Sequence, residues 1–377
     1  MTFIIDICLF DRRKMETLQE YSIYNYNISR LDVNKLNEYK NNLVYLNYIP
    51  TKWEQQIRYI YSEKKLDNYI LVKATDMYYM YITPYQHPET KYLDVLNHIV
   101  HNGVDRQNER TGVGTLSVFS TELKYDLLQD YFPVQDTRNT PRKTIWREVN
   151  WYLSGSTDVT ELHKWKIHVW DGNTNKEFLE QQNLSYEEYD MGPTYGFQFR
   201  HAGAEYKGKS YNYENQGVDQ VERLIDGMIN NPESRRHIIQ LYHVNQLEQM
   251  SLPPCLMMYQ FYLEKIKDNT YYIDGIFYSR SSDIFLAGYW NICQARIIID
   301  MLTKQVYNKS QNVLIARNLI WKIGDAHIYK HQITQVKELL KLKPRYYYQL
   351  DVIDDKVGPL LKQKYTPQSS LTSTMAV

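Results

Sequence analysis

Three strand-like runs in the second half of the chain constrain its fold most. They read MMYQFYLEKI (257–266), TYYIDGIFYS (270–279) and NVLIARNLIWKIG (312–324), and each is rich in the aromatic and β-branched residues that favour strands. Between the last two, NICQARIIIDMLTK (291–304) predicts a long, mostly buried helix. Apolar spacing and stop signals predict three further helices, at 92–103, 144–155 and 217–232. Helices and strands interleave without a regular βαβ period, which predicts an α+β or mixed α/β fold rather than a doubly wound sheet.

Composition divides the chain into two parts. Residues 1–88 are polar, rich in Tyr and Asn, and carry no recognisable motif, although NYILVKATDMYYMYITPY (68–85) has strand-like content. The apolar start FIIDICLF (3–10) is broken by Asp6 and lacks a basic flank, so we interpret it as a strand and not as a signal peptide. We therefore expect a small appended α/β segment of unknown role at 1–88 and the main domain at 89–377.

Charge and cysteine content exclude several classes of protein. Lysine plus arginine equals aspartate plus glutamate, at 44 each, so no net charge draws the whole chain to DNA or to a membrane surface. The three cysteines, Cys8, Cys255 and Cys293, are too few for a disulfide framework. No run is long and apolar enough to span a membrane. These features predict a soluble, cytoplasmic protein, and we interpret its 36 tyrosines as structural.

Two consecutive prolines, Pro253 and Pro254, precede Cys255 at the start of the first long strand. A rigid turn of this kind can aim a thiol, whose thiolate form is a nucleophile when a positive neighbour or a base stabilises it. The alternative is a buried cysteine of the core, which is the commoner case for a lone cysteine.

Arginines occur on both sides of this cysteine in the sequence. Arg235 and Arg236 form a pair upstream, Arg280 and Ser281 follow in SRSSDIF, and Arg110 lies in ERTGVGT before a glycine-flexed turn. Arginine binds phosphate through two parallel hydrogen bonds, so the set could form an anion site. Taken singly, each arginine is more simply read as a surface charge.

Four other polar residues are candidates for a site. His327 and Tyr329 alternate in GDAHIY, so both project to one side of a strand, where they could hold a sugar hydroxyl or form a core pair. Asn291 lies where a loop is predicted to become a helix, and its amide could cap that helix or bind a base edge. Glu148 lies within an apolar helix, where a carboxylate is costly unless it has partners, which indicates a raised pKa and proton transfer.

Six motifs occur together and in a familiar order. They are RTGVGT, GPTYGFQFRHAGAEY, QGVDQVERLIDGMINNPESRR, LPPC followed by QFYL, SRSSDIFLAGYWN and GDAHIYKH, and the set resembles the thymidylate synthase family. The resemblance covers about residues 90–340, and the spacing from the arginine pair to Cys255 also matches. The last three residues, MAV, resemble the C-terminus of eukaryotic-type members. The fold implied is a mixed sheet flanked by helices.

The resemblance implies a folate-dependent one-carbon transfer to C5 of dUMP. Cys255 would attack C6 of the uracil ring, Glu148 would organise protons around O4, Tyr195 would assist removal of the C5 proton, and Asn291 would read O4 and N3. The implied co-substrate is 5,10-methylenetetrahydrofolate, and no metal ion is implied. A homodimer is implied as well, with arginines that cross the interface.

Binding residues are also implied by the resemblance. For the 5′-phosphate they are Arg110, Arg280, Ser281 and, reaching across the dimer, Arg235 and Arg236. His327 and Tyr329 would hold the ribose 3′-hydroxyl. For the folate they are Trp170, Asp283, Leu286 and the terminal Val377, which would close over it.

Several positions depart from the family's pattern. Leu256 stands where the synthases have His, Ser279 where they have Gln, Tyr289–Trp290 where they have Pro-Phe, and Tyr242–His243 where they have Trp-Asn. Most of these positions surround the water network and the folate. The 5-methylene intermediate on Cys255 can take a hydride to give dTMP or water to give 5-hydroxymethyl-dUMP, and the choice depends on which of the two the site admits.

The remodelled water network favours the second outcome. We therefore expect a deoxyuridylate hydroxymethylase, of a branch known in viruses that replace thymine, acting in the host cytoplasm. Asn291 favours uracil, because the cytidylate hydroxymethylases carry Asp at that position. A divergent thymidylate synthase is the alternative, and the MAV tail favours it, since a lid that excludes water promotes hydride transfer.

Two further interpretations stay open. A non-catalytic nucleotide- or RNA-binding relative is disfavoured, because Cys255, Glu148, Tyr195, Asn291 and the arginines are all present. A second activity in residues 1–88 would make the enzyme bifunctional, but that segment shows no dihydrofolate reductase pattern and is short for a catalytic domain.

Overall fold

The computed structural model describes residues 5–6, 45–47, 59–62, 65, 69–74, 79–82, 87–107 and 112–373. The chain divides into two compact units, one of Met1–Thr90 with Lys343–Tyr347 and one of Lys91–Leu342 with Tyr348–Val377. The boundary predicted between residues 88 and 89 lies close to this division. The role of residues 1–88 stays unassigned.

The smaller unit contains a five-stranded sheet. Its strand order is β1 (Ile5–Asp6), β2 (Tyr45–Asn47), β3 (Tyr59–Ser62), β5 (Tyr79–Ile82), β4 (Ile70–Ala74). β1 and β2 are parallel and the other pairs are antiparallel. The strand-like stretch 68–85 therefore forms a β4–β5 pair, while of the strand expected at 3–10 only Ile5–Asp6 falls within the described residues.

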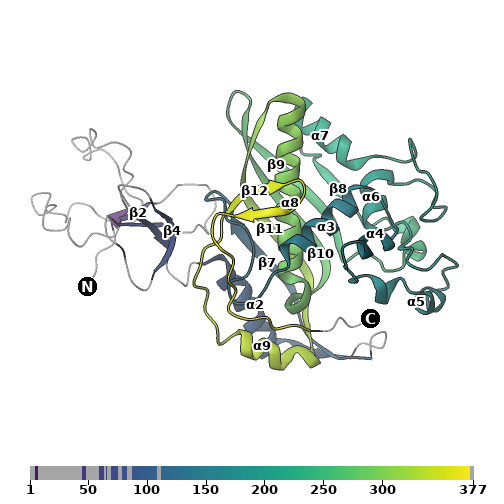
Figure 1. The fold of residues 1–377 in the computed structure, drawn as a ribbon, viewed down its shortest axis with the longest axis horizontal. Helices are drawn as coiled ribbons and strands as arrows, with labels where there is room; N and C mark the ends of the chain where they lie inside the picture. The colour runs from purple at the N-terminus through teal and green to yellow at the C-terminus, as the bar shows by residue number, and fades with distance from the viewer. Residues whose placement is uncertain are drawn as a thin grey trace, which may run out of the picture. The chain divides into compact units, whose positions relative to one another are not determined.

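The larger unit is built on a six-stranded mixed sheet (Figure 1). Its order is β6 (Val104–Arg106), β7 (Thr115–Asp126), β11 (Val313–Tyr329), β10 (Thr270–Asp283), β9 (Leu256–Lys267), β8 (Ile238–Gln240). β10 and β11 are parallel and every other neighbouring pair is antiparallel. The three strands predicted from residue type are β9, β10 and β11, and the mixed α/β class is confirmed.

Helix α8 (Ile284–Ser310) makes the crossover that two parallel strands require. It leaves the end of β10, packs against β10 and β11, and returns the chain to the start of β11 (Figure 1). Asp283 caps it, since its Oδ1 accepts a hydrogen bond of 2.9 Å from the backbone N–H of Leu286. Because the helix begins at Ile284, Asn291 lies inside it, and the interpretation of Asn291 as an N-cap is wrong.

Shorter elements complete the chain. α3 (Arg142–Leu153) packs on α8 and α6 (Tyr195–His201), and α7 (Gln220–Asn230) packs on α6 and α8. The remaining elements are α2 (Pro88–Asn102), α4 (Thr160–His163), η5 (Asp171–Asn173), α5 (Lys176–Gln181), η6 (Val244–Gln249), η7 (Lys330–Gln332), α9 (Ile333–Leu339), β12 (Leu350–Asp354) and β13 (Gly358–Leu361). None of the described helices has the length and hydropathy needed to cross a bilayer.

Tyrosines account for part of the packing between these elements. Tyr92 donates its hydroxyl to the Ile284 carbonyl at 3.0 Å, and its ring meets that of Tyr289 edge-on at 4.9 Å. The Tyr125 ring stacks on Tyr131 and meets Tyr289 edge-on. All four are buried. These contacts support the structural interpretation of the tyrosine excess, because each ring fills core volume, and the Tyr92 hydroxyl also makes a hydrogen bond there.

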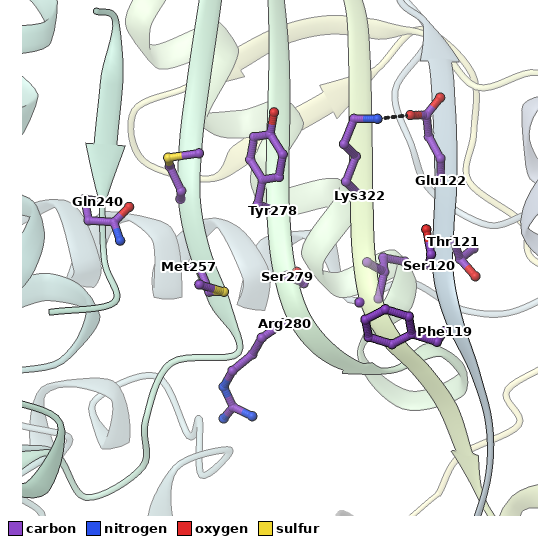
Figure 2. Close-up of a pocket in the computed structure, with 13 residues that line it drawn as sticks. Phe119, Ser120, Thr121, Glu122, Gln240, Met257, Tyr278, Ser279, Arg280 and Lys322 are labelled. Carbon is purple, nitrogen blue, oxygen red and sulfur yellow. Dashed lines mark hydrogen bonds and ion pairs between the residues drawn. The ribbon is translucent and has the colours of Figure 1, made fainter. Parts of the chain in front are cut away.

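The face of the sheet away from α8 carries a depression in the part of the larger unit that the structure describes. Glycine 275 faces α8, since a Cβ there would lie 3.1 Å from Ile299, so Tyr278 points to the other side. Strand register places Met258, Tyr278, Lys322 and Glu122 side by side across four strands. They line a depression of about 610 Å³, in which Lys322 pairs with Glu122 (Figure 2). Arg280 lines the same depression (Figure 2).

One glycine controls the spacing of β10 and β11. Gly324 faces Arg280 across the parallel pair, and a Cβ at this position would lie 2.7 Å from the Arg280 carbonyl oxygen. We expect Gly324→Ala to push the strands apart and to lower the free energy of unfolding by about 1–3 kcal/mol, measured by urea denaturation. Gly227→Ala in α7 is the control, because its Cβ meets only His237 at 3.4 Å and should stabilise that helix by about 0.5–1 kcal/mol. Equal stability of Gly324→Ala and the parent chain would contradict this account.

Candidate functional site

The turn before β9 is held by a residue of β10. Cys255, half-buried, accepts a hydrogen bond of 2.9 Å at its carbonyl from the backbone N–H of Arg280. The Arg280 side chain donates from Nε to the Pro254 carbonyl at 3.0 Å and from Nη2 to the Pro253 carbonyl at 2.8 Å. Prolines have no N–H, so the backbone of each of these two residues can be fixed by hydrogen bonding only through its carbonyl. The two prolines and one arginine therefore set the direction of the cysteine side chain.

The same guanidinium also faces the sulfur. Arg280 Nη2 lies 3.7 Å from Cys255 Sγ. A positive charge at this distance favours negative charge on the sulfur, which is the reactive form of a thiol. Its Nη1 makes no hydrogen bond to the described residues and so remains available to an anion. The other cysteine of this unit, Cys293, is fully buried in α8, so it has the structural role that the alternative reading proposed for Cys255.

Tyr195 approaches the cysteine from α6. Its hydroxyl oxygen accepts a hydrogen bond of 3.1 Å from the backbone N–H of Cys255, which leaves the hydroxyl proton for another partner. Burial is the largest influence on this phenol and raises its pKa, so it stays protonated at neutral pH. Its ring stacks on Tyr152 at 5.0 Å and lies 5.7 Å from the Trp170 ring. The backbone at Tyr195 has φ of +22°, a strained value for a side chain of this size.

Glu148 on α3 is buried and accepts hydrogen bonds from four side chains. Tyr152 and Trp170 donate to Oε1 at 3.2 and 2.8 Å, and Trp290 and Gln294 donate to Oε2, Gln294 at 2.6 Å. Burial raises the pKa of Glu148, and the four donors oppose that rise without cancelling it. The sequence-based expectation of a partnered, shifted carboxylate agrees with this geometry.

Two of these donors were missed from the sequence. The sequence pattern marks Trp290 only as a departure from the family, and it gives Gln294 no role. A signal did exist, because Trp290 and Gln294 are four residues apart on one helix, as are Glu148 and Tyr152 on another, so each pair shares a helix face. Which helix faces which could not be read from that spacing.

Asn291 lies between these donors on α8. Trp290 precedes it and Gln294 follows three residues later, on an adjacent part of the same helix face. Its half-buried amide makes no hydrogen bond to any described residue. An amide with one acceptor and two donors is therefore left for a ligand beside the Glu148 network.

Polar side chains gather where β10 and β11 end in register. His327 Nδ1 lies 2.9 Å from Asp325 Oδ1 and 3.4 Å from Ser281 Oγ. The His327 and Tyr329 rings meet edge-on at 5.3 Å, as expected for alternate residues on one side of a strand. Tyr329 is buried and His327 is half-buried, so the pair borders the core rather than lying wholly within it.

The residues implied for the folate are only partly described. Asp283 accepts from Gln332 Nε2 at 2.6 Å as well as capping α8, and burial raises its pKa. Leu286 and Trp170 are half-buried. Val377 lies outside the described residues, and so does Arg110 among the arginines implied for phosphate.

Arg235 and Arg236 stand apart from the other candidates. They are exposed in the turn between α7 and β8, and neither forms an ion pair with any residue that the structure describes. Within one chain, hydrogen bonds and ring contacts join Cys255, Arg280, Tyr195 and Glu148 through Tyr152 and Trp170. This arrangement provides a nucleophile, a cation, a neutral hydroxyl and a proton-holding carboxylate, which suits addition to an electron-poor ring followed by proton transfer.

Comparison with known proteins agrees with these motifs. The family model described as thymidylate synthase matches residues 90–374. The thymidylate synthase of Homo sapiens is 36% identical over 299 residues, covering 77% of this chain and 91% of the relative, and that of Herpesvirus ateles is 35% identical, covering 77% and 99%. The bifunctional dihydrofolate reductase-thymidylate synthase of Leishmania major is 33% identical over 262 residues, covering 69% of this chain. The chain spans 48% of the length of that bifunctional relative.

The raised pKa of Glu148 predicts a pH dependence of stability. The folded state keeps the proton above about pH 4.3, where the unfolded chain loses it, so folding is favoured less as pH rises. Gln cannot titrate, so Glu148→Gln lacks this dependence. The free energy of unfolding of the parent, relative to that of Glu148→Gln, should begin to fall at about pH 4.3 and should stop falling above the raised pKa of Glu148. The fall should be about 1.4 kcal/mol for each unit by which the two pKa values differ.

Urea denaturation of both chains across this pH range measures the difference. Glu248→Gln, changed at an exposed carboxylate, is the matched control for the substitution itself. The burial argument would be contradicted if the free energy of unfolding of the parent, minus that of Glu148→Gln, increased with pH.

Proposed function

The chain belongs to the thymidylate synthase family, and from this premise we propose that it converts dUMP and 5,10-methylenetetrahydrofolate into dTMP and dihydrofolate. The family's reaction uses methylenetetrahydrofolate as co-substrate and needs no metal ion. The observation that carries the proposal is the position of Cys255, aimed by the Pro–Pro turn, with Arg280 Nη2 at 3.7 Å and the Tyr195 hydroxyl on its backbone N–H.

The first step is addition of the Cys255 sulfur to C6 of the uracil ring. The electron pair of the C5–C6 double bond moves toward C5 and O4. C5 then attacks the methylene group of the folate, whose bond to N10 breaks with its electron pair passing to that nitrogen. A fixed nucleophile makes this addition faster, because the entropy of orientation is lost before the reaction begins. The turn that Arg280 holds supplies such a fixed mount.

Residues of α8 and α3 stabilise the negative charge that develops on O4. The Asn291 amide can donate to O4 while its oxygen accepts from N3–H, which matches uracil and not cytosine. Glu148, whose pKa is raised by burial, can hold a proton close to the same edge. The Tyr195 hydroxyl accepts a hydrogen bond from the Cys255 N–H, so its own proton can be shared with the substrate. It assists the later loss of the C5 proton.

Binding of the sugar and phosphate falls to the ends of β10 and β11. Arg280 and Ser281, with Arg110, are assigned to the 5′-phosphate, and His327 and Tyr329 to the ribose 3′-hydroxyl. Arg280 offers Nη1 for this purpose. Asp283, Leu286, Trp170 and Val377 are assigned to the folate, where the tail closes the site.

A homodimer is part of the proposal. Arg280 lines the depression on the sheet face away from α8, so cations carried by a second copy that covers this face would arrive beside it (Figure 2). Arg235 and Arg236 are exposed and unpaired in the described chain, which suits arginines that bind phosphate in the partner's site. A symmetric dimer supplies them to both sites at once.

The fate of the 5-methylene intermediate on Cys255 determines which of two products forms. Leu256 and Ser279 replace the His and Gln typical of the synthases, and this favoured the hydroxymethylase interpretation. Leu256 is apolar and buried, however, so it cannot hold water, and Ser279 is buried with its hydroxyl oxygen already accepting from Trp321 Nε1 at 2.7 Å. Trp290 and Gln294 occupy the second oxygen of Glu148. The loss of the His and Gln side chains leaves fewer groups that could hold water beside the intermediate, which favours hydride transfer, and the relatives named above are thymidylate synthases.

The hydroxymethylase remains the second candidate, because the His and Gln that order water in the family are absent here. Incubation of the full chain with dUMP and methylenetetrahydrofolate should yield dTMP and dihydrofolate in equal amounts, measured by chromatography and by the absorbance of dihydrofolate. Tetrahydrofolate with 5-hydroxymethyl-dUMP would reject the synthase and establish the second candidate.

Asn291 provides a separate test of base reading. We expect Asn291→Asp to shift the ratio of kcat/KM for dUMP over dCMP by at least about tenfold toward dCMP, because a protonated Asp donates to the cytosine N3. Asn308→Asp, changed at an exposed position of the same helix, is the matched control and should keep the parental ratio. An unaltered preference in Asn291→Asp would refute the base-reading role.

A further inference from the structure

We propose that His163, His168 and Asp171 form a binding site for a divalent transition-metal ion of the zinc class. The three residues belong to α4, the turn after it and the first position of η5. The site is separate from the reaction proposed above and does not depend on it.

The ligand atoms already converge. His163 Nε2 lies 2.7 Å from Asp171 Oδ1, and His168 Nδ1 lies 2.8 Å from Asp171 Oδ2. One ligand atom from each residue lies within 4.8 Å of the others, and no second such group of three occurs among the described residues. The two imidazole rings stack with centroids 4.8 Å apart, so their nitrogens approach from the same side of the turn.

Two imidazoles and a carboxylate are a donor set suited to zinc. Zinc is bound by His nitrogen and Asp oxygen at about 2.0–2.2 Å, which places tetrahedral ligand atoms about 3.3 Å apart. The His–Asp distances need to lengthen by about half an ångström, and the two nitrogens need to approach one another, a change within reach of side-chain rotation. The ion would replace the protons that now bridge the carboxylate and the imidazoles, and water would take the remaining position.

The backbone holds this turn in place without an ion. Leu162 and Ile167 are buried, and the Ile167 N–H donates to the Leu162 carbonyl at 3.2 Å. The Asp171 N–H donates to the His168 carbonyl at 3.3 Å, and the Tyr189 ring packs edge-on against His163. Binding therefore orders little new structure, which lowers its entropic cost. The His168 side chain is 59% exposed, so an ion can reach the site from solvent.

Trp170 connects this cluster to the candidate active site. It directly precedes Asp171, and its indole donates to Glu148 Oε1 at 2.8 Å. An ion that fixes Asp171 would thus act one residue from a hydrogen bond to the buried carboxylate. In the competing explanation, the Asp171 carboxylate only hydrogen-bonds to His163 and His168 and stabilises the turn, with no ion involved.

Metal titration of the full chain separates these explanations. After removal of metals with a chelator, calorimetry should show one Zn²⁺ bound per chain, and Co²⁺ should give the visible bands of a four-coordinate ion. The Co²⁺ spectrum should lack a sulfur-to-metal charge-transfer band, because the site contains no thiolate. His168→Ala and Asp171→Asn should each lower the Zn²⁺ affinity by at least about tenfold. His101→Ala, changed at an exposed histidine of α2, should bind Zn²⁺ with the same affinity as the parent chain.

Three results would overturn the proposal. They are the absence of saturable binding, an affinity unchanged by His168→Ala, and a charge-transfer band that assigns the ion to a cysteine. His168 is exposed, so its replacement leaves the core intact, and far-ultraviolet circular dichroism verifies that the variant is folded.

Discussion

The hydrogen bonds from Arg280 to the Pro–Pro turn are the contacts on which the rest of the site depends. Through them a residue of β10 fixes the backbone that carries Cys255, and the same guanidinium stands 3.7 Å from the sulfur. One side chain thus combines two tasks, the orientation of the Cys255 side chain and electrostatic support for negative charge on its sulfur. Its own position depends on Gly324, the one residue type that lets β11 approach the Arg280 carbonyl so closely.

A second constraint is the burial of Glu148. A carboxylate without partners would be expensive in this interior, and here four donors from α3, α8 and the segment before η5 surround it. The network joins elements that are far apart in the sequence, and it positions Asn291 beside it. The site therefore draws its rigidity from the core packing of α8 against the sheet, not from loops.

Much of the larger unit could be predicted from the sequence. The residue types of β9, β10 and β11 and the apolar run of α8 are strong local signals, and they were read correctly. The start of α8 was misplaced, because the apolar residues before Asn291 continue the helix back to the Asp283 cap. The order of the six strands and the parallel β10–β11 pair could not be derived, since pairing depends on long-range register that no local pattern encodes.

The candidate site shows the same limit. Cys255, Arg280 and Tyr195 were found because motifs carry them, and the structure brings them into contact. Trp290 and Gln294 were missed as partners of Glu148, since 142 and 146 residues separate them from it in sequence. The buried position of Leu256 and the Ser279–Trp321 hydrogen bond also needed the structure, and they are the reason that we propose dTMP rather than the hydroxymethyl product.

Covalent bond formation between sulfur and a pyrimidine is the central claim, and intact mass measurement tests it most directly. The full chain is incubated with 5-fluoro-dUMP and methylenetetrahydrofolate, because fluorine at C5 prevents the proton loss that would release the adduct. We expect a mass increase equal to both ligands, located by peptide mapping at Cys255 and absent from Cys255→Ala. An unchanged mass, or an adduct that persists in Cys255→Ala, would contradict the account.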